Sequence, residues 1–147
     1  EMAHKQGKRI FIADDEPEVV DLVQMVLDMG GYTVSSAGDG ERALASIRAE
    51  PPDLILLDVR MPRMSGLEVL EQLRADPETA SIPVIMLSVV TTYPEVQAAL
   101  QQGAIAYLAK PFGLKDMSRL VSRILAMDGA ERDAFRQQAL KNIGSRW

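Results

Sequence analysis

The sequence predicts a doubly wound α/β fold, with five parallel strands in one sheet and helices on both faces. Short apolar segments typical of strands alternate with longer segments whose apolar residues recur at helical spacing. Short loops join these segments, which is typical of repeated βα units. Residues 54–57 are apolar throughout, as expected of a central strand that is covered on both faces.

The chain length favours one domain. Its 147 residues, 47% of them hydrophobic, can build one full core with a short appendage, but not two domains. We expect a polar leader over residues 1–8, part of which could be a cloning remnant. The folded domain then covers residues 9–127, and a C-terminal helix or linker covers residues 128–147.

In the first half of the chain, apolar runs predict three strands, and apolar residues at helical spacing predict two helices. Gly30 and Gly31 end the first helix, because glycine readily adopts the left-handed conformation of a helix stop. Pro51 and Pro52 prevent continuation of the second helix. In chain order these elements cover residues 9–13, 17–29, 32–36, 41–49 and 53–57.

In the second half, two Ser/Thr–Glu pairs have the spacing of capping boxes. Ser65 with Glu68 opens a third helix, and Thr92 with Glu95 opens a fourth. Pro83 can begin a strand, because the first position needs no ladder hydrogen bond. The remaining elements are expected at residues 83–88 (strand), 93–102 (helix), 104–109 (strand) and 114–126 (helix).

The last twenty residues differ in kind. Asp128 with Glu131 can cap a sixth helix that reaches about Ile143. Its apolar stripe is thin, which suits a docking helix or a linker, and a solvated tail helix is an equal alternative. The stripe consists of Ala130, Ala134, Phe135, Ala139 and Ile143.

Composition excludes several functions. A formal charge of -5 without a long basic tract disfavours direct nucleic-acid contact. The absence of cysteine excludes disulfides and thiolate chemistry. No apolar run reaches the ~20 residues that span a bilayer, and no signal peptide is visible, so we expect a cytoplasmic protein without membrane contact. The single histidine, His4, lies in the polar leader and is expected to be solvated.

Charged side chains follow three of the predicted strands. Asp14 and Asp15 come after the first strand, Asp58 after the third and Lys110 after the fifth. The carboxyl ends of parallel strands meet at one edge of a sheet, where open α/β folds bind their ligands. We therefore expect these three carboxylates and one ammonium group to meet there, around a hard cation and a phosphoryl group.

The expected cluster suits magnesium and aspartyl phosphate chemistry. Carboxylates brought close repel one another, and a divalent cation relieves the repulsion. Oxygen ligands select Mg²⁺, with Mn²⁺ as a possible substitute. Asp58 is best placed as the nucleophile that takes up a phosphoryl group. Lys110 and the hydroxyl of Ser88 would then neutralise phosphoryl oxygens.

At this point the chain resembles the receiver domain of two-component response regulators over residues 9 to about 127. The family pattern is an acidic pair after strand one, an acceptor Asp after strand three, Ser or Thr after strand four and Lys-Pro after strand five. The corresponding residues of this chain are Asp14-Asp15, Asp58, Ser88 and Lys110-Pro111.

The resemblance implies a strand order of 2-1-3-4-5 and assigns roles to the site. Asp58 is the phosphoacceptor for a sensor histidine kinase or a phosphotransfer protein. Asp15 and Asp58 bind Mg²⁺ directly together with the backbone carbonyl of Arg60, and Asp14 acts through water. Lys110 pairs with the phosphoryl group, and its bond to Pro111 is cis, an isomer that only X-Pro bonds adopt at low cost.

The resemblance also implies a switch. After phosphorylation Ser88 moves toward the phosphoryl group, and Tyr107 turns inward. The face formed by the helix at 93–102, the strand at 104–109 and the helix at 114–126 then changes for a downstream effector or output domain. A homodimer through this face is possible for the family.

Two positions, Arg60 and Val90, are expected to tune the access of water to the phosphoryl group. Val90 cannot orient a water molecule, whereas Arg60 could shield the phosphate or hold it electrostatically. We expect self-catalysed phosphorylation and slow loss of phosphate, without the turnover of an enzyme.

Each motif has a simpler alternative. Asp14 and Asp15 could merely cap the first helix, with Asp15 and Glu18 as a capping pair, and Tyr107 could be only a strand aromatic. A phosphoesterase with an aspartyl-phosphate intermediate would want an aspartate at position 60, which is Arg60. A flavodoxin-like cofactor binder would want a loop rich in Gly, Ser and Thr after the first strand, where this chain is acidic.

Overall fold

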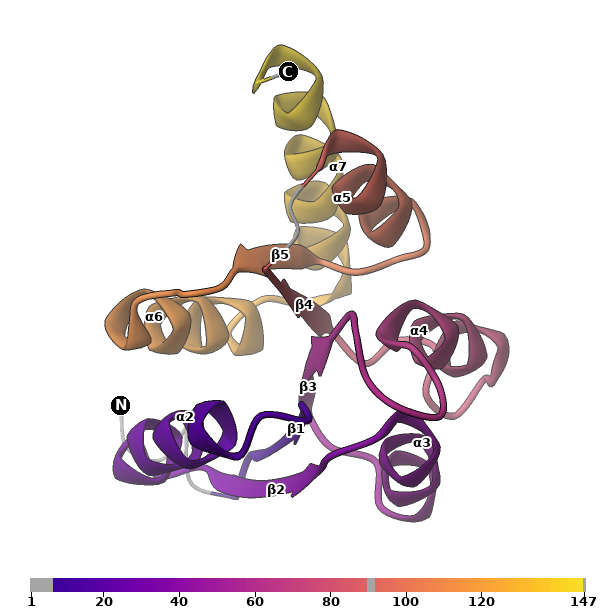
Figure 1. Cartoon of the computed structure of the whole chain (residues 1–147). Coiled ribbons are helices and arrows are strands. Elements are labelled where there is room, and N and C mark those ends of the chain that lie inside the picture. Colours follow the sequence, from indigo (N-terminus) through magenta and orange to yellow (C-terminus); the bar gives the residue numbers. More distant parts are fainter. Residues whose placement is uncertain (1–6, 90–91, 147) are drawn as a thin grey trace.

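The computed structural model describes residues 7–89 and 92–146 and contains strands and helices in alternation (Figure 1). In chain order the elements are β1 (Arg9–Ala13), α2 (Pro17–Met29), β2 (Thr33–Ala37), α3 (Gly40–Ala49), β3 (Leu54–Asp58), α4 (Gly66–Ala75), β4 (Val84–Ser88), α5 (Tyr93–Gln101), β5 (Ala106–Ala109), α6 (Leu114–Leu125) and α7 (Gly129–Arg146).

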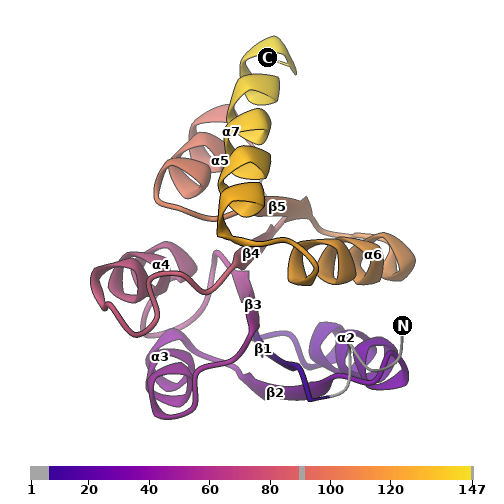
Figure 2. The same cartoon turned by 180° about the vertical axis from the view of Figure 1, so that it is seen from behind.

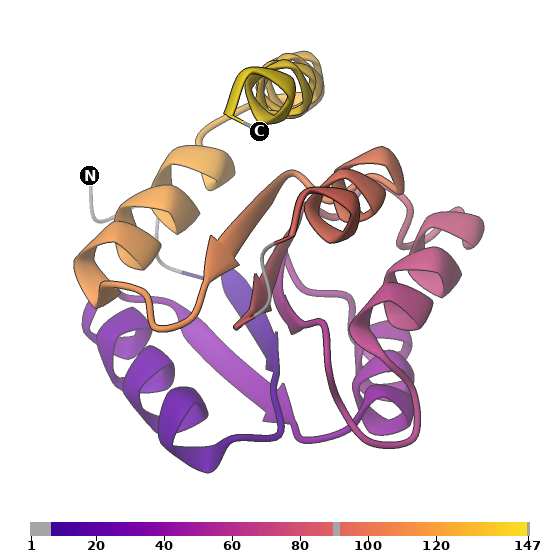
Figure 3. The same ribbon diagram turned by 45° about the horizontal axis from the view of Figure 1, so that its top comes forward.

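The five strands form one parallel sheet in the order β2-β1-β3-β4-β5, which confirms the predicted fold class and strand order. α2 and α6 cover one face of the sheet, and α3, α4 and α5 cover the other (Figure 3). Every residue of β3 is buried, as its apolar sequence predicts for a central strand. Alternate β3 residues therefore pack into the two separate cores.

The predicted boundaries are close to the observed ones, with small shifts at strand starts. Strand two begins at Thr33, one residue late, because the Tyr32 N–H closes α2 by donating to the Leu27 carbonyl. Strand five begins at Ala106, because the Ala104 N–H closes α5 by donating to the Ala99 carbonyl. These residues complete the preceding helix before the sheet resumes.

The capping box predicted at Thr92 and Glu95 is wrong. α5 does begin after Thr92, but the Thr92 side chain makes no capping hydrogen bond. The Glu95 carboxylate instead accepts hydrogen bonds from Arg60 and Tyr107. Ser65 and Glu68, with the same spacing, do form both hydrogen bonds of a capping box at the start of α4. Tertiary partners that take up the Glu95 carboxylate account for the difference.

The C-terminal helix α7 begins with the predicted pair, because Asp128 and Glu131 exchange backbone-to-carboxylate hydrogen bonds of 2.8 and 2.9 Å. α7 packs beside α5 (Figure 2). Phe135 contacts the core shared by α2 and α6, with the Arg123 guanidinium 5.1 Å from the centre of its ring. Residues 128–143 are thus anchored on the domain.

No helix within residues 7–89 and 92–146 combines the length and apolar character needed to cross a bilayer.

Candidate functional site

Four of the predicted site residues lie at the carboxyl edge of the sheet. Asp58 and Ser88 are the last residues of β3 and β4, while Asp14 and Lys110 directly follow β1 and β5. The parallel order β1-β3-β4-β5 places all four strand ends side by side. Asp14, Asp58 and Ser88 are buried, so the strand ends hold polar groups away from bulk water.

Lys110 is the counter-charge of the cluster. Its Nζ atom lies 2.7 Å from Asp14 Oδ2, 2.7 Å from Glu16 Oε1 and 3.3 Å from Asp58 Oδ2. The Lys110 side chain is only 8% exposed. Lysine side chains are usually solvated at the protein surface. Lys110 is instead enclosed by three carboxylates and is therefore not an ordinary surface residue.

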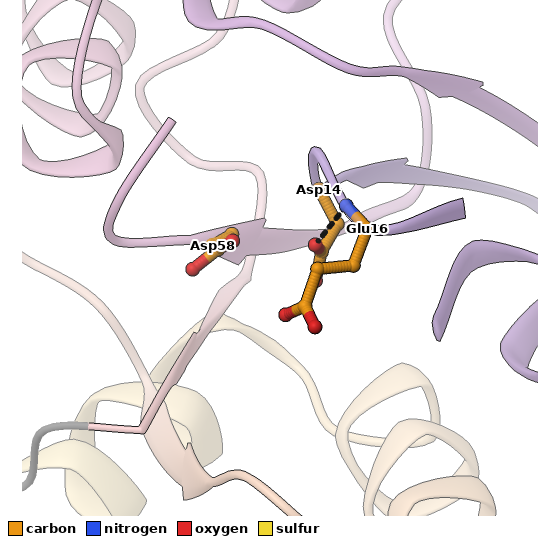
Figure 4. A group of neighbouring side chains, drawn as sticks. All are labelled: Asp14, Glu16 and Asp58. Carbon is orange, nitrogen blue, oxygen red and sulfur yellow. Dashed lines mark hydrogen bonds between the residues drawn. The ribbon is translucent and has the colours of Figure 1, made fainter. Parts of the chain in front are cut away.

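Asp14, Glu16 and Asp58 form the carboxylate group of the site (Figure 4). Each offers one oxygen, and the three oxygens lie within 4.8 Å of one another. Asp14 Oδ2 is buried and has no hydrogen-bond partner among the described residues, because its contact with Lys110 is an ion pair without hydrogen-bond geometry. Close carboxylate oxygens with a spare lone pair fit a hard divalent cation.

Asp15, a predicted metal ligand, and Glu16, which was not predicted, lie differently in the site. Asp15 is exposed and lines a cavity of about 260 Å³ beside Asp58, but it is not one of the three clustered carboxylates. Glu16, which sequence reasoning missed, reaches Lys110 instead. The available signal was a third consecutive acid at the start of α2.

Backbone hydrogen bonds orient the two buried aspartates. Asp14 Oδ1 accepts from the Glu16 N–H at 2.9 Å, and Asp58 Oδ1 accepts from the Arg60 N–H at 3.2 Å. Such turns use one carboxylate oxygen and leave the other directed into the site. The residue before α2 is Glu16, whose side chain makes no cap. A role of Asp15 as the helix cap is therefore excluded.

Burial controls the protonation of the central pair. Burial, reinforced by the charge of Asp14, raises the pKa of Asp58 to about 6, although Lys110 opposes the shift. Burial alone would lower the pKa of Lys110, but its contacts with Asp14 and Glu16 outweigh this and hold the pKa above its usual value. Lys110 stays charged while Asp58 is poised to lose its proton near neutral pH.

A chain of polar contacts leads away from the site. Arg60 Nη2 lies 3.2 Å from Glu95 Oε1, and the Tyr107 hydroxyl donates to Glu95 Oε2 at 3.2 Å. The Tyr107 hydroxyl also interacts with that of Ser88. Burial and then Glu95 raise the pKa of Tyr107 to about 12 against the effect of Ser88. Tyr107 is therefore more than a strand aromatic.

Two further predictions and one unpredicted feature concern the surrounding loops. The Lys110–Pro111 bond is cis, as predicted. Val90 lies outside the described residues. Gly66 is a feature that sequence reasoning missed: its N–H donates to the Val59 carbonyl at 2.8 Å, and a Cβ atom there would collide with the Asp58 carbonyl oxygen. The loop after β3 therefore closes tightly onto the end of β3.

An apolar cavity of about 400 Å³ adjoins the site between α2 and the start of α6. Lys110 and Glu16 form its border with the carboxylate cluster. Its wall consists of Val19, Leu22, Val23, Val89, Pro111, Phe112 and Leu114.

Comparison with known proteins supports the same family. The family model described as response regulator receiver domain matches residues 10–124. The DNA-binding dual master transcriptional regulator RpaA of Synechocystis sp. is 37% identical over 92% of this chain and 56% of its own length. The alkaline phosphatase synthesis transcriptional regulatory protein PhoP of Bacillus subtilis is 39% identical over 81% of this chain and 49% of its own length. The chain spans about half the length of these curated relatives.

Solved structures agree. A putative response regulator from Chloroflexus aurantiacus has a TM-score of 0.77 and 33% identity, covering 82% of this chain and 98% of the other. The chemotaxis response regulator CheY4 of Vibrio cholerae has a TM-score of 0.75 and 30% identity, covering 80% and 98%. Together with the site at the carboxyl edge, these matches show that the chain belongs to the response regulator receiver domain family.

Proposed function

We propose that this receiver domain is a phosphorylation switch in which Asp58 takes a phosphoryl group from a phosphohistidine of a sensor histidine kinase or phosphotransfer protein. The observation that supports this proposal most strongly is the enclosure of Lys110 Nζ by Asp14, Glu16 and Asp58 at the carboxyl edge of the sheet. An Asp58 carboxylate oxygen attacks phosphorus, the P–N bond breaks, and its electron pair returns to the imidazole of the donor. The product is an acyl phosphate on Asp58.

The donor set fits Mg²⁺, with Mn²⁺ as a substitute. Asp14, Glu16 and Asp58 would hold it, and Asp15 and the Arg60 carbonyl are the further ligands predicted from the family. When bound, the cation neutralises negative charge on the phosphoryl oxygens. The spare lone pair of buried Asp14 Oδ2 supports this assignment.

The protein side chains supply position and charge. Asp58 is buried and held by the Arg60 N–H, so its carboxylate is oriented and poorly solvated. Lys110 lies 3.3 Å from Asp58 and can pair with a phosphoryl oxygen. Ser88 ends the neighbouring strand β4, where its hydroxyl can donate a hydrogen bond to a second phosphoryl oxygen. Both groups stabilise charge that develops during phosphoryl transfer.

The phosphoryl group is proposed to leave slowly. The guanidinium of Arg60 is always protonated and cannot take a proton from attacking water. Its ion pair with Glu95 also directs it toward α5. Self-catalysed phosphorylation followed by slow hydrolysis is the activity of a switch, without turnover of a substrate.

The output face is proposed to be α5, β5 and α6, which would act on a downstream effector or output domain in the cytoplasm. Glu95 links Arg60, next to the acceptor loop, with Tyr107 on β5. A new negative charge on Asp58 would compete for Arg60 and for Ser88. It would therefore change the contacts of Glu95 with Arg60 and with Tyr107. A homodimer through this face is a further possibility, although α7 already covers part of α5.

The apolar cavity between α2 and α6 is the proposed contact for the donor. It borders Lys110 and Glu16, so a protein bound there presents a histidine close to Asp58. Leu22 of the cavity wall is about half exposed, at 47%, and so is Met25, at 53%, which lies one turn further along α2. Exposed apolar residues beside a reactive group are typical of a partner contact.

The test is incubation with acetyl phosphate and Mg²⁺, followed by intact mass measurement. The wild-type chain should gain one phosphoryl group. Asp58→Asn should gain none, and Asp21→Asn, an exposed aspartate on α2, should behave as wild type. Normal labelling of Asp58→Asn would defeat the assignment of the acceptor.

A further inference from the structure

A third cavity, of about 490 Å³, lies at the opposite edge of the sheet from Asp58. Pro83 and Ile105, which directly precede β4 and β5, place it at the amino ends of the strands. Arg74 at the end of α4 lines the cavity together with Arg132 and Arg136 from the first turns of α7. Three guanidinium groups from two distant helices thus share one cavity.

The charge of this cavity is unbalanced. One carboxylate, Asp133, lies among the three arginines and pairs with Arg136 at 3.2 Å. Within residues 7–89 and 92–146, neither Arg74 nor Arg132 forms an ion pair. The cavity therefore holds a surplus of two positive charges, although the chain as a whole is acidic.

Backbone carbonyls position the arginines without neutralising them. Arg74 donates to the Gly103 carbonyl at 3.0 Å, Arg136 to the Leu100 carbonyl at 2.9 Å and Arg132 to the Ile124 carbonyl at 3.2 Å. A guanidinium has five N–H groups, so most donors of Arg132 remain for a ligand. The contacts of Arg132 and Arg136 attach α7 to the ends of α6 and α5, but none of the three contacts balances the surplus charge.

The arginines also act on one another. Burial, and then the charge of Arg136, lower the pKa of Arg74 to about 10, so Arg74 remains charged at neutral pH. Holding like charges together in a partly buried place costs free energy, and an anion between them would remove that cost.

We propose that this cavity binds a small phosphate-bearing metabolite. Arg74, Arg132 and Arg136 hold the phosphate, and an uncharged body packs toward Pro83 and Ile105. A phosphate dianion matches the surplus of two charges, and planar guanidinium forks match its oxygens. The volume lies within the usual range of small-molecule sites and exceeds what a bare phosphate needs. The proposal concerns the other end of the strands and does not depend on phosphorylation of Asp58.

The test is an NMR titration of the ¹⁵N-labelled chain with a chelator present, so that the carboxylate site has no metal. The probes are inorganic phosphate, adenosine 5′-monophosphate and, as the uncharged control, adenosine. The amides of Gly103, Ile105 and Gly129 should shift in a saturable way with both phosphates and not with adenosine. Lack of saturable shifts with both phosphates would overturn the proposal. Equal affinity for both phosphates would reject a metabolite and leave inorganic phosphate as the ligand.

Three variants make the test specific. Arg132→Gln should weaken binding by about tenfold or more, because a charge-assisted contact is lost. Asp133→Asn removes the competing carboxylate and should tighten binding, an effect that partial unfolding cannot imitate. Arg119→Gln, an exposed arginine of α6, should leave the affinity unchanged. Equal weakening by Arg119→Gln and Arg132→Gln would show that only the overall charge matters and would overturn the site.

Discussion

The Tyr107 hydroxyl donates a hydrogen bond to Glu95 Oε2 at 3.2 Å, which ties the edge strand β5 to the first turn of α5. The other oxygen of the same carboxylate lies 3.2 Å from Arg60, two residues after Asp58. One side chain therefore joins the loop after β3, the start of α5 and β5. This junction lies on the face that we propose as the output surface.

Replacing Glu95 with Gln should lower the pKa of Tyr107. Glu95 raises this pKa, but burial is the larger cause, so the pKa should stay above the ordinary value of about 10. Tyrosinate absorbance followed through an alkaline titration measures the change, and Tyr107→Phe identifies which step belongs to Tyr107. An unchanged titration in Glu95→Gln would show that the carboxylate does not act on the phenol.

Replacing Asp58 with Asn should stabilise the metal-free protein at neutral pH. The folded protein raises the pKa of Asp58 from 3.8 to about 6, so the folded state holds this proton more tightly than the unfolded chain. The contribution of this proton to the stability of the folded state is complete below about pH 4 and is lost as the pH rises through about 6. We expect the free energy of unfolding of Asp58→Asn to exceed that of the wild-type chain by about 1 to 3 kcal/mol at pH 7.5.

Urea unfolding with a chelator present measures this difference at pH 7.5 and at pH 4.5. The gap between Asp58→Asn and wild type should shrink at the lower pH, where wild-type Asp58 is protonated. Asp21→Asn, on the exposed side of α2, serves as the control. A gap that is constant with pH would mean that ionisation of Asp58 is not its source.

Replacing Lys110 with Met should tighten Mg²⁺ binding. The ammonium lies within 3.3 Å of three carboxylates and competes with any other cation there. A unit charge ~4 Å away contributes about 4 kcal/mol at an effective dielectric constant near 20, so a tenfold or larger gain in affinity is expected. Calorimetric titration measures it, with exposed Lys115→Met as the control. Weaker Mg²⁺ binding in Lys110→Met would contradict this competition.

Replacing Gly66 with Ala should destabilise the fold and slow phosphorylation. The new Cβ would collide with the carbonyl oxygen of Asp58, and the displaced loop would shift the acceptor. Overpacking of this kind costs about 1 to 3 kcal/mol. Chemical unfolding and the rate of labelling by acetyl phosphate provide the two measurements. Gly129→Ala, where nothing lies within 4 Å of the new atom, should be neutral or slightly stabilising.

The residues that could be predicted from sequence are those whose place follows from topology. Asp14, Asp58 and Lys110 end or follow parallel strands, so the order of the sheet alone brings them together. Loop and helix side chains have no such constraint. Glu16 reaches Lys110, whereas Asp15 lines the cavity beside Asp58, because their directions depend on the turn that the Asp14 side chain makes with the Glu16 N–H.

The capping boxes give the same lesson for local structure. Ser65 and Glu68 satisfy the pattern: Glu68 forms no ion pair among residues 7–89 and 92–146, and its carboxylate accepts a hydrogen bond from the Ser65 N–H. Glu95 has the same spacing from Thr92, yet it binds Arg60, which is 35 positions away in the sequence. A local pattern cannot report a competing charge that only folding brings close.

The attachment of α7 has a mechanical consequence. Only residues 126–128 separate it from α6, and Arg136 fastens it to the last turn of α5. Its eighteen residues form a rod of roughly 27 Å. A small tilt of α5 against α6 would swing the far end of this rod through a larger arc, so α7 could serve as a lever that magnifies displacement at the output face.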